Sequence, residues 1–278
     1  MLPKKLRTYR RIYATFFFGL FVALLYLTDY GRMKGFETSL LLELDPLTAI
    51  AAFLTSGTFY MGLLLALLII VPTLFLGRFF CSWICPLGII NQFLGWLWHG
   101  LHPHERYELN QYRSSYRIKY YILTAMLVLA LLGSLQIGLL DPIALMVRSF
   151  TVTVLPALNM NGAAIYLDQP LFHGAAAIAI VLIAILLANR FLPRFWCRVL
   201  CPLGALLGVL SRRAPLRIQL DFDKCIDCDK CLKACQGGCG PHKELRVSEC
   251  HLCMNCIEDC PAQALHYGLP KDRSSVHQ

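Results

Sequence analysis

Residues 250–261 read Cys250-His251-Leu252-Cys253-Met254-Asn255-Cys256-Ile257-Glu258-Asp259-Cys260-Pro261. The spacing C-x2-C-x2-C-x3-C-P lets three close thiolates bind one [4Fe-4S] cluster, while the cysteine before the proline reaches a second cluster. Thiolates suit this role because the irons of such clusters prefer soft, charge-donating ligands. The stretch therefore predicts a small domain that holds two iron–sulfur clusters.

A second cysteine run lies upstream, at Cys225, Cys228, Cys231 and Cys235. Gln236 follows this run in place of the proline, and Cys239 lies close behind, so either Cys235 or Cys239 completes the second cluster; the spacing favours Cys235. Paired C-x2-C motifs also bind zinc, but triplet runs are unusual for zinc. The odd total of 13 cysteines argues against a disulfide framework. We expect Cys225, Cys228, Cys231 and Cys260 to hold one [4Fe-4S] cluster, and Cys250, Cys253, Cys256 and Cys235 to hold the other.

The rest of the chain is unusually apolar. Hydrophobic residues make up 57% of the chain and charged residues only 15%, whereas a soluble domain carries about 25% charged residues. Four apolar runs, at 12–29, 59–77, 118–140 and 171–192, are long enough to cross a bilayer. A soluble protein of this length would have too little polar surface to cover them as core helices. We therefore expect an all-α membrane protein with four transmembrane helices: a membrane domain over 1–213 and a small C-terminal α+β ferredoxin-like domain over 214–278.

The placement of charge predicts an orientation. Lys and Arg concentrate before the first apolar run, between the second and third, and after the fourth, and such residues favour the cytoplasmic side. The basic stretch before the first run is followed by no small-residue cleavage site, so this run is expected to remain as a membrane segment. We expect a multi-pass protein of the cytoplasmic (inner) membrane with both termini in the cytoplasm. The net charge of +9 lies beside apolar runs, which indicates membrane lipid and no nucleic acid as a partner.

The first 213 residues contain an internal duplication. The stretch Arg78-Phe79-Phe80-Cys81-Ser82-Trp83-Ile84-Cys85-Pro86-Leu87-Gly88 returns as Arg194-Phe195-Trp196-Cys197-Arg198-Val199-Leu200-Cys201-Pro202-Leu203-Gly204. Both copies follow an even-numbered apolar run, which predicts two parallel repeats, over 12–100 and 118–213. Four cysteines would then face one another: Cys81, Cys85, Cys197 and Cys201. Three interpretations stay open: a third iron–sulfur cluster, buried structural thiols and a redox-active thiol pair.

An Asp-Pro pair stands in each repeat, at Asp45-Pro46 and at Asp141-Pro142. Because Asp at the N-cap and Pro at the first helical position start helices, each pair predicts a short helix. A carboxylate near a low-dielectric pocket can also accept a proton during quinol oxidation. The candidates for such a quinol site are Asp45, Asp141, Asp168 and His173. Helix capping is the favoured interpretation of the two Asp-Pro pairs.

Duplicated C-x3-C-P motifs after apolar runs, followed by a two-cluster tail, resemble the NapH/NosR-type membrane ferredoxins. The resemblance covers nearly the whole chain, and it is to the compact NapH-like form, since the flavin-binding outer domain of the larger members is not found. It implies the membrane component of a quinol dehydrogenase. Such a subunit relays electrons between the quinone pool and a periplasmic or membrane redox partner through tandem [4Fe-4S] clusters, without substrate turnover of its own. The alternative function is an assembly or maturation factor that reduces a metal or thiol during biogenesis of a respiratory enzyme.

Overall fold

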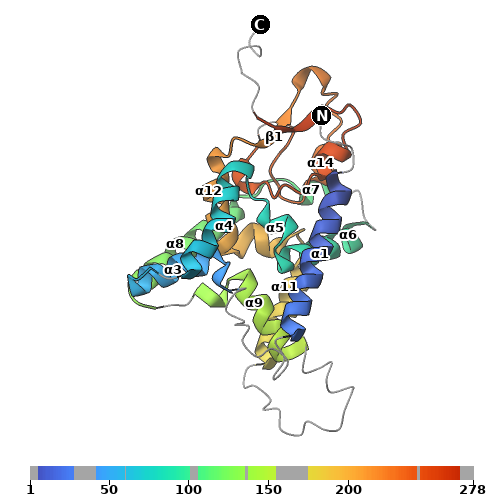
Figure 1. Ribbon diagram of the computed structural model, residues 1–278. Coiled ribbons are helices and arrows are strands. Elements are labelled where there is room, and N and C mark those ends of the chain that lie inside the picture. Colours follow the sequence, from blue (N-terminus) through green and yellow to red (C-terminus); the bar gives the residue numbers. More distant parts are fainter. Residues whose placement is uncertain are drawn as a thin grey trace.

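The structure, a computed structural model, describes residues 6–27, 42–59, 61–100, 106–134, 137–154, 175–242 and 245–269. It is mainly helical, and the C-terminal tail packs across one end of the helical part, next to the start of the first helix (Figure 1). The helices of the first half are α1 (Leu6–Leu27), α3 (Pro46–Ser56), α4 (Met61–Leu76), α5 (Phe80–Trp83) and α6 (Pro86–Gly100). Those of the second half are α7 (Arg106–Leu109), α8 (Ile118–Leu131), α9 (Pro142–Ser149), α11 (Ala175–Ala188) and α12 (Pro202–Leu210), with the π-helical turns η3 (Phe150–Val154) and η4 (Trp196–Leu200) and the short 3-10 turns η1 (Ser114–Arg117) and η2 (Ile137–Leu139).

The four predicted transmembrane helices are not found in the described part of the chain. The helices over the four apolar runs are α1, with 22 residues, α4, with 16, and α8 and α11, with 14 each. At 1.5 Å per residue the last three are about 21–24 Å long, shorter than the ~30 Å hydrocarbon core of a bilayer. The longer α1 carries Arg7, Arg10 and Arg11 near its start. Among the described residues, no helix is both long and apolar enough to span a membrane. This finding contradicts the predicted membrane fold and the predicted multi-pass inner-membrane location.

Two of these helices are followed by glycines with a left-handed backbone conformation, which a hydropathy pattern does not reveal. Gly77, directly after α4, has φ = 91°, and Gly133, two residues after α8, has φ = 85°. Left-handed conformations of this kind terminate helices, and glycine adopts them without a Cβ penalty. The chain therefore turns at the last residue of the predicted run 59–77 and well inside the predicted run 118–140.

The two Asp-Pro pairs begin helices, as predicted. Asp45 precedes α3 and accepts two backbone N–H groups of its first turn, both at 3.1 Å. Asp141 precedes α9 and accepts two in the same way, both at 2.8 Å. Each aspartate thereby satisfies N–H groups that have no partner within their own helix. The equivalent caps show that the duplication seen in the sequence extends to local structure.

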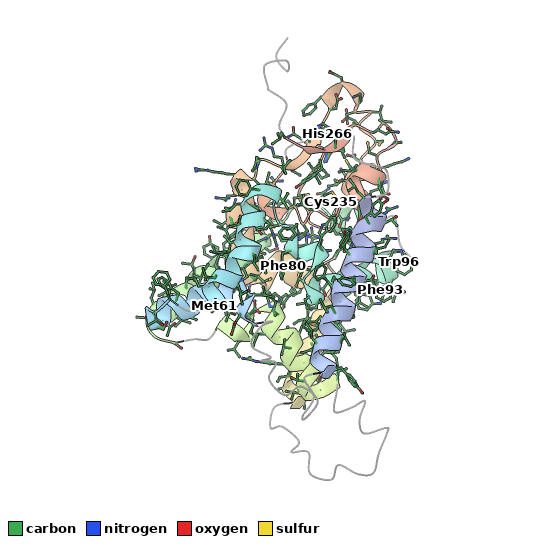
Figure 2. All side chains as sticks on the ribbon, viewed as in Figure 1. Met61, Phe80, Phe93, Trp96, Cys235 and His266 are labelled. Carbon is green, nitrogen blue, oxygen red and sulfur yellow. The ribbon has the colours of Figure 1, made fainter. Side chains whose placement is uncertain are left out.

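The helices enclose one large apolar core, which contains Phe80, Leu87, Met146 and Leu203, all at most 2% exposed. Phe80 lies inside the molecule, whereas Met61 and Trp96 lie at its outside (Figure 2). Three of the four cysteines of the C-x3-C-P motifs belong to this core. The motifs are thus placed in the interior of the helical part.

The tail forms a second, smaller core around a two-stranded sheet. Strands β1 (Arg217–Leu220) and β2 (Leu265–Gly268) pair antiparallel, with Ile218 opposite Tyr267. Between them lie α13 (Lys230–Ala234), α14 (Asn255–Glu258) and the short turns η6 (Phe222–Lys224) and η7 (Val247–Glu249), with η5 (Ser211–Arg213) before β1. The tail is fixed to the helices by contacts such as Trp83 Nε1 to the carbonyl of Leu252 at 3.1 Å. Arg7 of α1 adds ion pairs to two acidic residues at the end of α14.

Candidate iron–sulfur sites

The structure brings the four cysteines of the duplicated motif together in the interior. We call Cys81, Cys85, Cys197 and Cys201 the interior group. All four are buried. Burial raises the pKa of Cys85 and of Cys201, and in both cases the neighbouring Cys197 and Cys81 raise it further, so the thiols of the two repeats lie close enough to interact. Two polar donors reach these sulfurs, since Asn91 Nδ2 lies 3.8 Å from Cys197 Sγ and the backbone N–H of Gly204 lies 3.2 Å from Cys201 Sγ.

The glycine that closes each motif copy permits this close packing. A Cβ at Gly88 would lie 2.1 Å from the carbonyl oxygen of Cys81, and a Cβ at Gly204 would lie 3.3 Å from Cys201 Sγ and 2.8 Å from Arg78 Nη2. Any side chain at Gly88 would push α5 and α6 apart. The repeated C-P-L-G ending therefore has a steric reason in each copy.

Four cysteines of the tail surround one small cavity near the surface. We call Cys225, Cys228, Cys231 and Cys260 the outer group, and all four line this cavity. Burial raises the pKa of Cys231 to about 12, and the other three thiols contribute in the same direction. Cys228 is exposed, while Cys225 and Cys260 are half-buried. The outer group is thus the one in contact with solvent.

The remaining tail cysteines gather between the outer group and the interior group. We call Cys235, Cys250, Cys253 and Cys256 the central group, and all four are buried. Burial raises the pKa of Cys256, and Cys253, Cys235 and Cys250 raise it further. Cys235 therefore lies close to the downstream run, and the exchange of the fourth cysteine between the two runs stays a prediction.

Cys239 lies beside this central group and contacts one member directly. Its Sγ is 3.2 Å from Cys235 Sγ, and its backbone N–H donates to the same sulfur at 3.5 Å. The hydrogen bond from the Cys239 thiol lowers the pKa of Cys235 to about 6, whereas the same interaction raises the pKa of Cys239 well above its usual value. Cys235 Sγ is therefore contacted by both the thiol and the backbone N–H of Cys239.

The two C-x2-C-x2-C loops share an unusual backbone conformation. The residue before the second cysteine and the residue after it are left-handed in both loops: Asp227 (φ = 47°) and Asp229 (φ = 53°) in one, Leu252 (φ = 51°) and Met254 (φ = 60°) in the other. Each such position costs of order 1–3 kcal/mol for residues other than glycine and persists only where the surroundings impose it, typically at ligand clamps. The repeated strain wraps both loops around a centre in the same way.

The equivalence extends to the fourth cysteine of each run. Gln263, three residues after Cys260, has φ = 51°, and Gly238, three residues after Cys235, has φ = 66°. Cys235 thus stands in the place that Cys260 holds in the other run, although no proline follows it. Ala264 holds the position of Cys239 in the other run, and its backbone N–H donates to Cys260 Sγ at 3.4 Å just as that of Cys239 donates to Cys235 Sγ at 3.5 Å.

Buried cations surround the cysteines. Five basic side chains are at most 1% exposed: Arg10, Arg78, Lys119, Arg194 and Arg198. Glu249 is buried among them, since Lys119 forms a short ion pair with its carboxylate and Arg78 Nη1 lies 3.9 Å from Glu249 Oε2. Because one carboxylate cannot neutralise five cations, and burying an unpaired charge is costly, this interior suits anionic groups such as thiolate-bound clusters.

The first arginine of each motif copy connects the interior group to the tail. Arg78 Nη2 lies 3.8 Å from Cys81 Sγ, and its Nη1 donates to the carbonyl of Ser248 at 2.7 Å, two residues before the downstream run. Arg194 Nη1 lies 3.5 Å from the carbonyl of Cys81, and its Nε donates to Gln236 Oε1 at 3.1 Å. One guanidinium therefore spans from the interior group to the edge of the central group on each side.

The two candidate quinol residues that the structure describes are buried, which is unfavourable for contact with a diffusible molecule. Asp45 and Asp141 are fully buried, and burial raises the pKa of both, with the nearby Asp45 as a further cause for Asp141. Their carboxylates cap α3 and α9, which is the interpretation the sequence favoured. Asp168 and His173 lie outside the described residues.

In the described part of the chain, no three or more His, Cys, Asp or Glu side chains are arranged to hold a single metal ion.

Comparison with known proteins defines the class. A family model described as a 4Fe-4S binding domain matches residues 58–102 and 174–219. Each stretch contains one copy of the C-x3-C-P motif, so one matched stretch supplies Cys81 and Cys85 and the other supplies Cys197 and Cys201. Together with the ferredoxin-type relatives described next, this match makes the chain an iron–sulfur electron-transfer protein.

The relatives are ferredoxin-type proteins. The chain is 27% identical to the ferredoxin-type protein NapH of Escherichia coli over 273 residues, 90% of this chain and 85% of NapH. It is 29% identical to the methylamine utilization ferredoxin-type protein MauN of Methylobacillus flagellatus over 234 residues, 78% of this chain and 72% of MauN. YccM of Escherichia coli is 32% identical over 218 residues, but these cover only 56% of that protein. No solved structure matches. The resemblance to NapH-type ferredoxins is confirmed by these matches.

Some residues of the site were not predicted from the sequence. Arg78 and Arg194 open the two motif copies, so their repetition was a visible signal, but their link to the tail depends on packing. Asn91 and Glu249 carried no signal, because an isolated polar residue does not show which sulfur or cation it will meet. His251 is buried, and neither ring nitrogen has a partner among the described residues; its sequence position between two cysteines gave no sign of this.

Proposed function

We propose that this protein transfers electrons between a quinol and a protein redox partner through three [4Fe-4S] clusters. The order of the cysteine groups carries the proposal: they run from the buried interior group through the buried central group to the solvent-exposed outer group. Arg78 and Arg194 bridge the first two groups, and Cys231 of the outer group interacts with Cys256 of the central group. A continuous series of redox centres between the core and the surface suits a relay.

The proposed ligands follow the three groups. The outer group holds one cluster and the central group a second, with Cys235 as the fourth ligand. The conformation shared with Cys260 and the donors that converge on its sulfur support Cys235 over Cys239. The clusters supply one-electron redox chemistry, whose potential depends on hydrogen bonds to the sulfurs and on solvent exposure. The chain's own part is to hold the thiolates, exclude water from the central group and direct Cys239 at one sulfur.

The interior group is proposed to hold the third cluster. Its donor set is four thiolates, the set that [4Fe-4S] clusters use. The family-model match over both motif copies supports a cluster there, and so do the buried cations Arg78 and Arg194 beside Cys81. The alternative of inert structural thiols would leave Arg194 without an anionic partner among the described residues and Arg78 with only the carboxylate of Glu249, 3.9 Å away.

Iron and acid-labile sulfide analysis tests the cluster number. Three clusters correspond to about 12 irons per chain. The double variant Cys81→Ser/Cys197→Ser should hold about eight, and Cys235→Ser should also lose about four. The matched control is Cys239→Ser, which should keep all the iron. Full iron content in the Cys81→Ser/Cys197→Ser protein would refute the third cluster, and loss of iron in Cys239→Ser would refute the choice of Cys235.

The quinol step is tested separately on the cluster-loaded protein. Tetramethyl-1,4-benzoquinol is added without oxygen, and EPR records reduced cluster; dithionite serves as the positive control. We expect partial reduction by the quinol. If dithionite reduces the protein and the quinol leaves it fully oxidised, the quinol part of the proposal is wrong, while the iron–sulfur part stands.

A further inference from the structure

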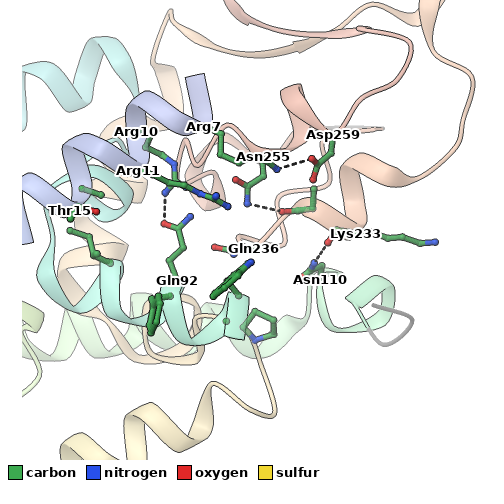
Figure 3. A pocket seen from close by; sticks show the side chains of 17 residues that line it. Arg7, Arg10, Arg11, Thr15, Gln92, Asn110, Lys233, Gln236, Asn255 and Asp259 are labelled. Carbon is green, nitrogen blue, oxygen red and sulfur yellow. Dashed lines mark hydrogen bonds and ion pairs between the residues drawn. The ribbon is translucent and has the colours of Figure 1, made fainter. Parts of the chain in front are cut away.

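A cavity of about 400 Å³ lies between α1, α6 and the tail (Figure 3). This volume is within the ~300–1,000 Å³ typical of small-molecule sites. Gly95 of α6 lines the cavity, and although this residue is buried, a Cβ added to it would meet no atom within 4 Å. The cavity is therefore real open space next to α6, and none of the cysteines lines it.

The cavity adjoins the central group. Ala234 and Gln236, on either side of Cys235, both line it, and so does Asn255, which precedes Cys256. A molecule bound there is separated from two proposed cluster ligands by a single residue along the chain. Any redox-active ligand in this cavity would be next to the central group.

One wall of the cavity is apolar and suits a flat ring. Phe93 and Trp96 contribute aromatic surface from α6, at 6.1 Å between ring centroids. The apolar lining consists of Ala14, Ile89, Phe93, Trp96, Pro193 and Ala234. Aromatic and aliphatic surface of this kind typically binds the ring of a ligand, and a few polar groups then fix its orientation.

The polar wall offers both donors and acceptors without partners. Arg10 Nη1 bonds Gln92, but Nε and Nη2 of this buried guanidinium have no partner among the described residues. The Oδ1 atoms of Asn110 and Asn255 are also buried without a partner there. Their orientation is fixed because each Nδ2 donates to a backbone carbonyl, at 2.8 Å and 3.5 Å. Buried polar groups are normally paired, so this wall indicates a ligand that both accepts and donates.

We propose that this cavity binds the ring of the quinol or quinone. The inference rests on the proposed function and gives its substrate a place away from Asp45 and Asp141. A quinol has two ring oxygens that accept hydrogen bonds and two hydroxyl hydrogens that donate them, so it matches Arg10 and the two asparagines at once. A phosphate-like anion would bind Arg10, but it would leave the aromatic wall uncovered.

The test is equilibrium dialysis of the cluster-loaded full chain with tetramethyl-1,4-benzoquinone, whose fully substituted ring does not add to thiols. Gly95→Leu places a side chain in the open space of the cavity and should weaken binding at least about tenfold. The matched control is Gly19→Leu on the exposed side of α1, where a Cβ also meets nothing within 4 Å; it should bind like the wild type. Iron content and the EPR spectrum of both variants should equal those of the wild type.

Each result of these measurements either supports or overturns the proposed quinone site. Quinone binding that Gly95→Leu leaves unchanged would overturn the cavity, as would inorganic phosphate that competes for the site. If the quinol reduces wild-type clusters and reduces Gly95→Leu equally fast, the cavity is wrong and the proposed function stands. If the quinol neither binds nor reduces the wild type, the proposed function fails with it.

Discussion

Replacing Gly88 by alanine should break the interior group, because this position has no room for a methyl group. The new Cβ would lie 2.1 Å from the carbonyl oxygen of Cys81 and 3.2 Å from its carbonyl carbon. A carbon–oxygen contact normally requires about 3.3 Å, so α5 and α6 must separate by about 1 Å. The obstacle is backbone, which cannot rotate away as a flexible side chain can. The displaced residue is itself one of the four cysteines of the interior group.

The expected magnitude follows from this overlap. Overpacking a dense core typically costs about 1–3 kcal/mol, and occasionally more; a backbone collision of this depth belongs at the upper end, about 3 kcal/mol. For a chain of this size that corresponds to a fall in Tm of roughly 6–12 °C, at about 2–4 °C per kcal/mol. The protein should also lose about four irons per chain as the sulfur of Cys81 moves.

The assay is a thermal unfolding scan combined with iron analysis of the purified protein. Two variants calibrate it. Gly95→Ala, on the same helix, adds its methyl group to open space; it should keep the iron content and raise Tm slightly, because alanine is favoured over glycine inside a helix by roughly 0.5–1 kcal/mol. Gly204→Ala meets the flexible end of the Arg78 side chain at 2.8 Å and Cys201 Sγ at 3.3 Å, but no backbone atom closer than 3.4 Å, so its effect should be intermediate. Equal behaviour of Gly88→Ala and Gly95→Ala would show that the steric reasoning is wrong.

Three further outcomes are expected. Glu249→Gln leaves Lys119 buried without its carboxylate and should lower the free energy of unfolding in urea by about 3–5 kcal/mol. The control Asp221→Asn removes an exposed ion pair and should change this free energy little. Equal effects of the two variants would contradict the buried pairing. Burial lowers the pKa of Lys119 to about 8. Between pH 8 and 10.5 the unfolded chain therefore binds more protons than the folded protein, and the free energy of unfolding should rise with pH. Lys119→Met should flatten this pH dependence, and an unchanged pH dependence would exclude Lys119 as its source. Cys239→Ala should keep its iron but lower the potential of one cluster, because a hydrogen bond to Cys235 is lost; identical redox titrations would argue against that bond.

Local sequence patterns predicted local structure well. The Asp-Pro pairs begin α3 and α9, and the two cysteine runs adopt equivalent loops, because each feature depends on neighbouring residues only. The prediction of four transmembrane helices from the apolar runs was wrong, because it depended on more than neighbouring residues. Hydropathy indicates that a stretch avoids water, but it does not show where Gly133 turns the chain, nor that α1 uses Arg7 to contact the tail.

The candidate site was predictable as pairs of cysteines and less so as a whole. The duplication implied that Cys81 and Cys197 would meet, and they do interact. The cavity between α1, α6 and the tail could not be foreseen, because its lining comes from separate segments that extend from Arg7 to Asp259. The same holds for Arg7, which reaches Glu258 across 251 positions. Such long-range contacts depend on packing, and no short motif encodes them.

The two repeats are equivalent around the cysteines and unlike where the tail covers them. Arg78 and Arg194 occupy the same motif position and both approach Cys81, yet one continues to Ser248 and the other to Gln236. A single tail cannot contact both repeats identically, so each arginine holds a different end of the central group. Because the same guanidinium groups contact the interior cysteines, the tail cannot shift without disturbing them. The interior and central groups therefore behave as one structural unit, as the proposed relay between them would require.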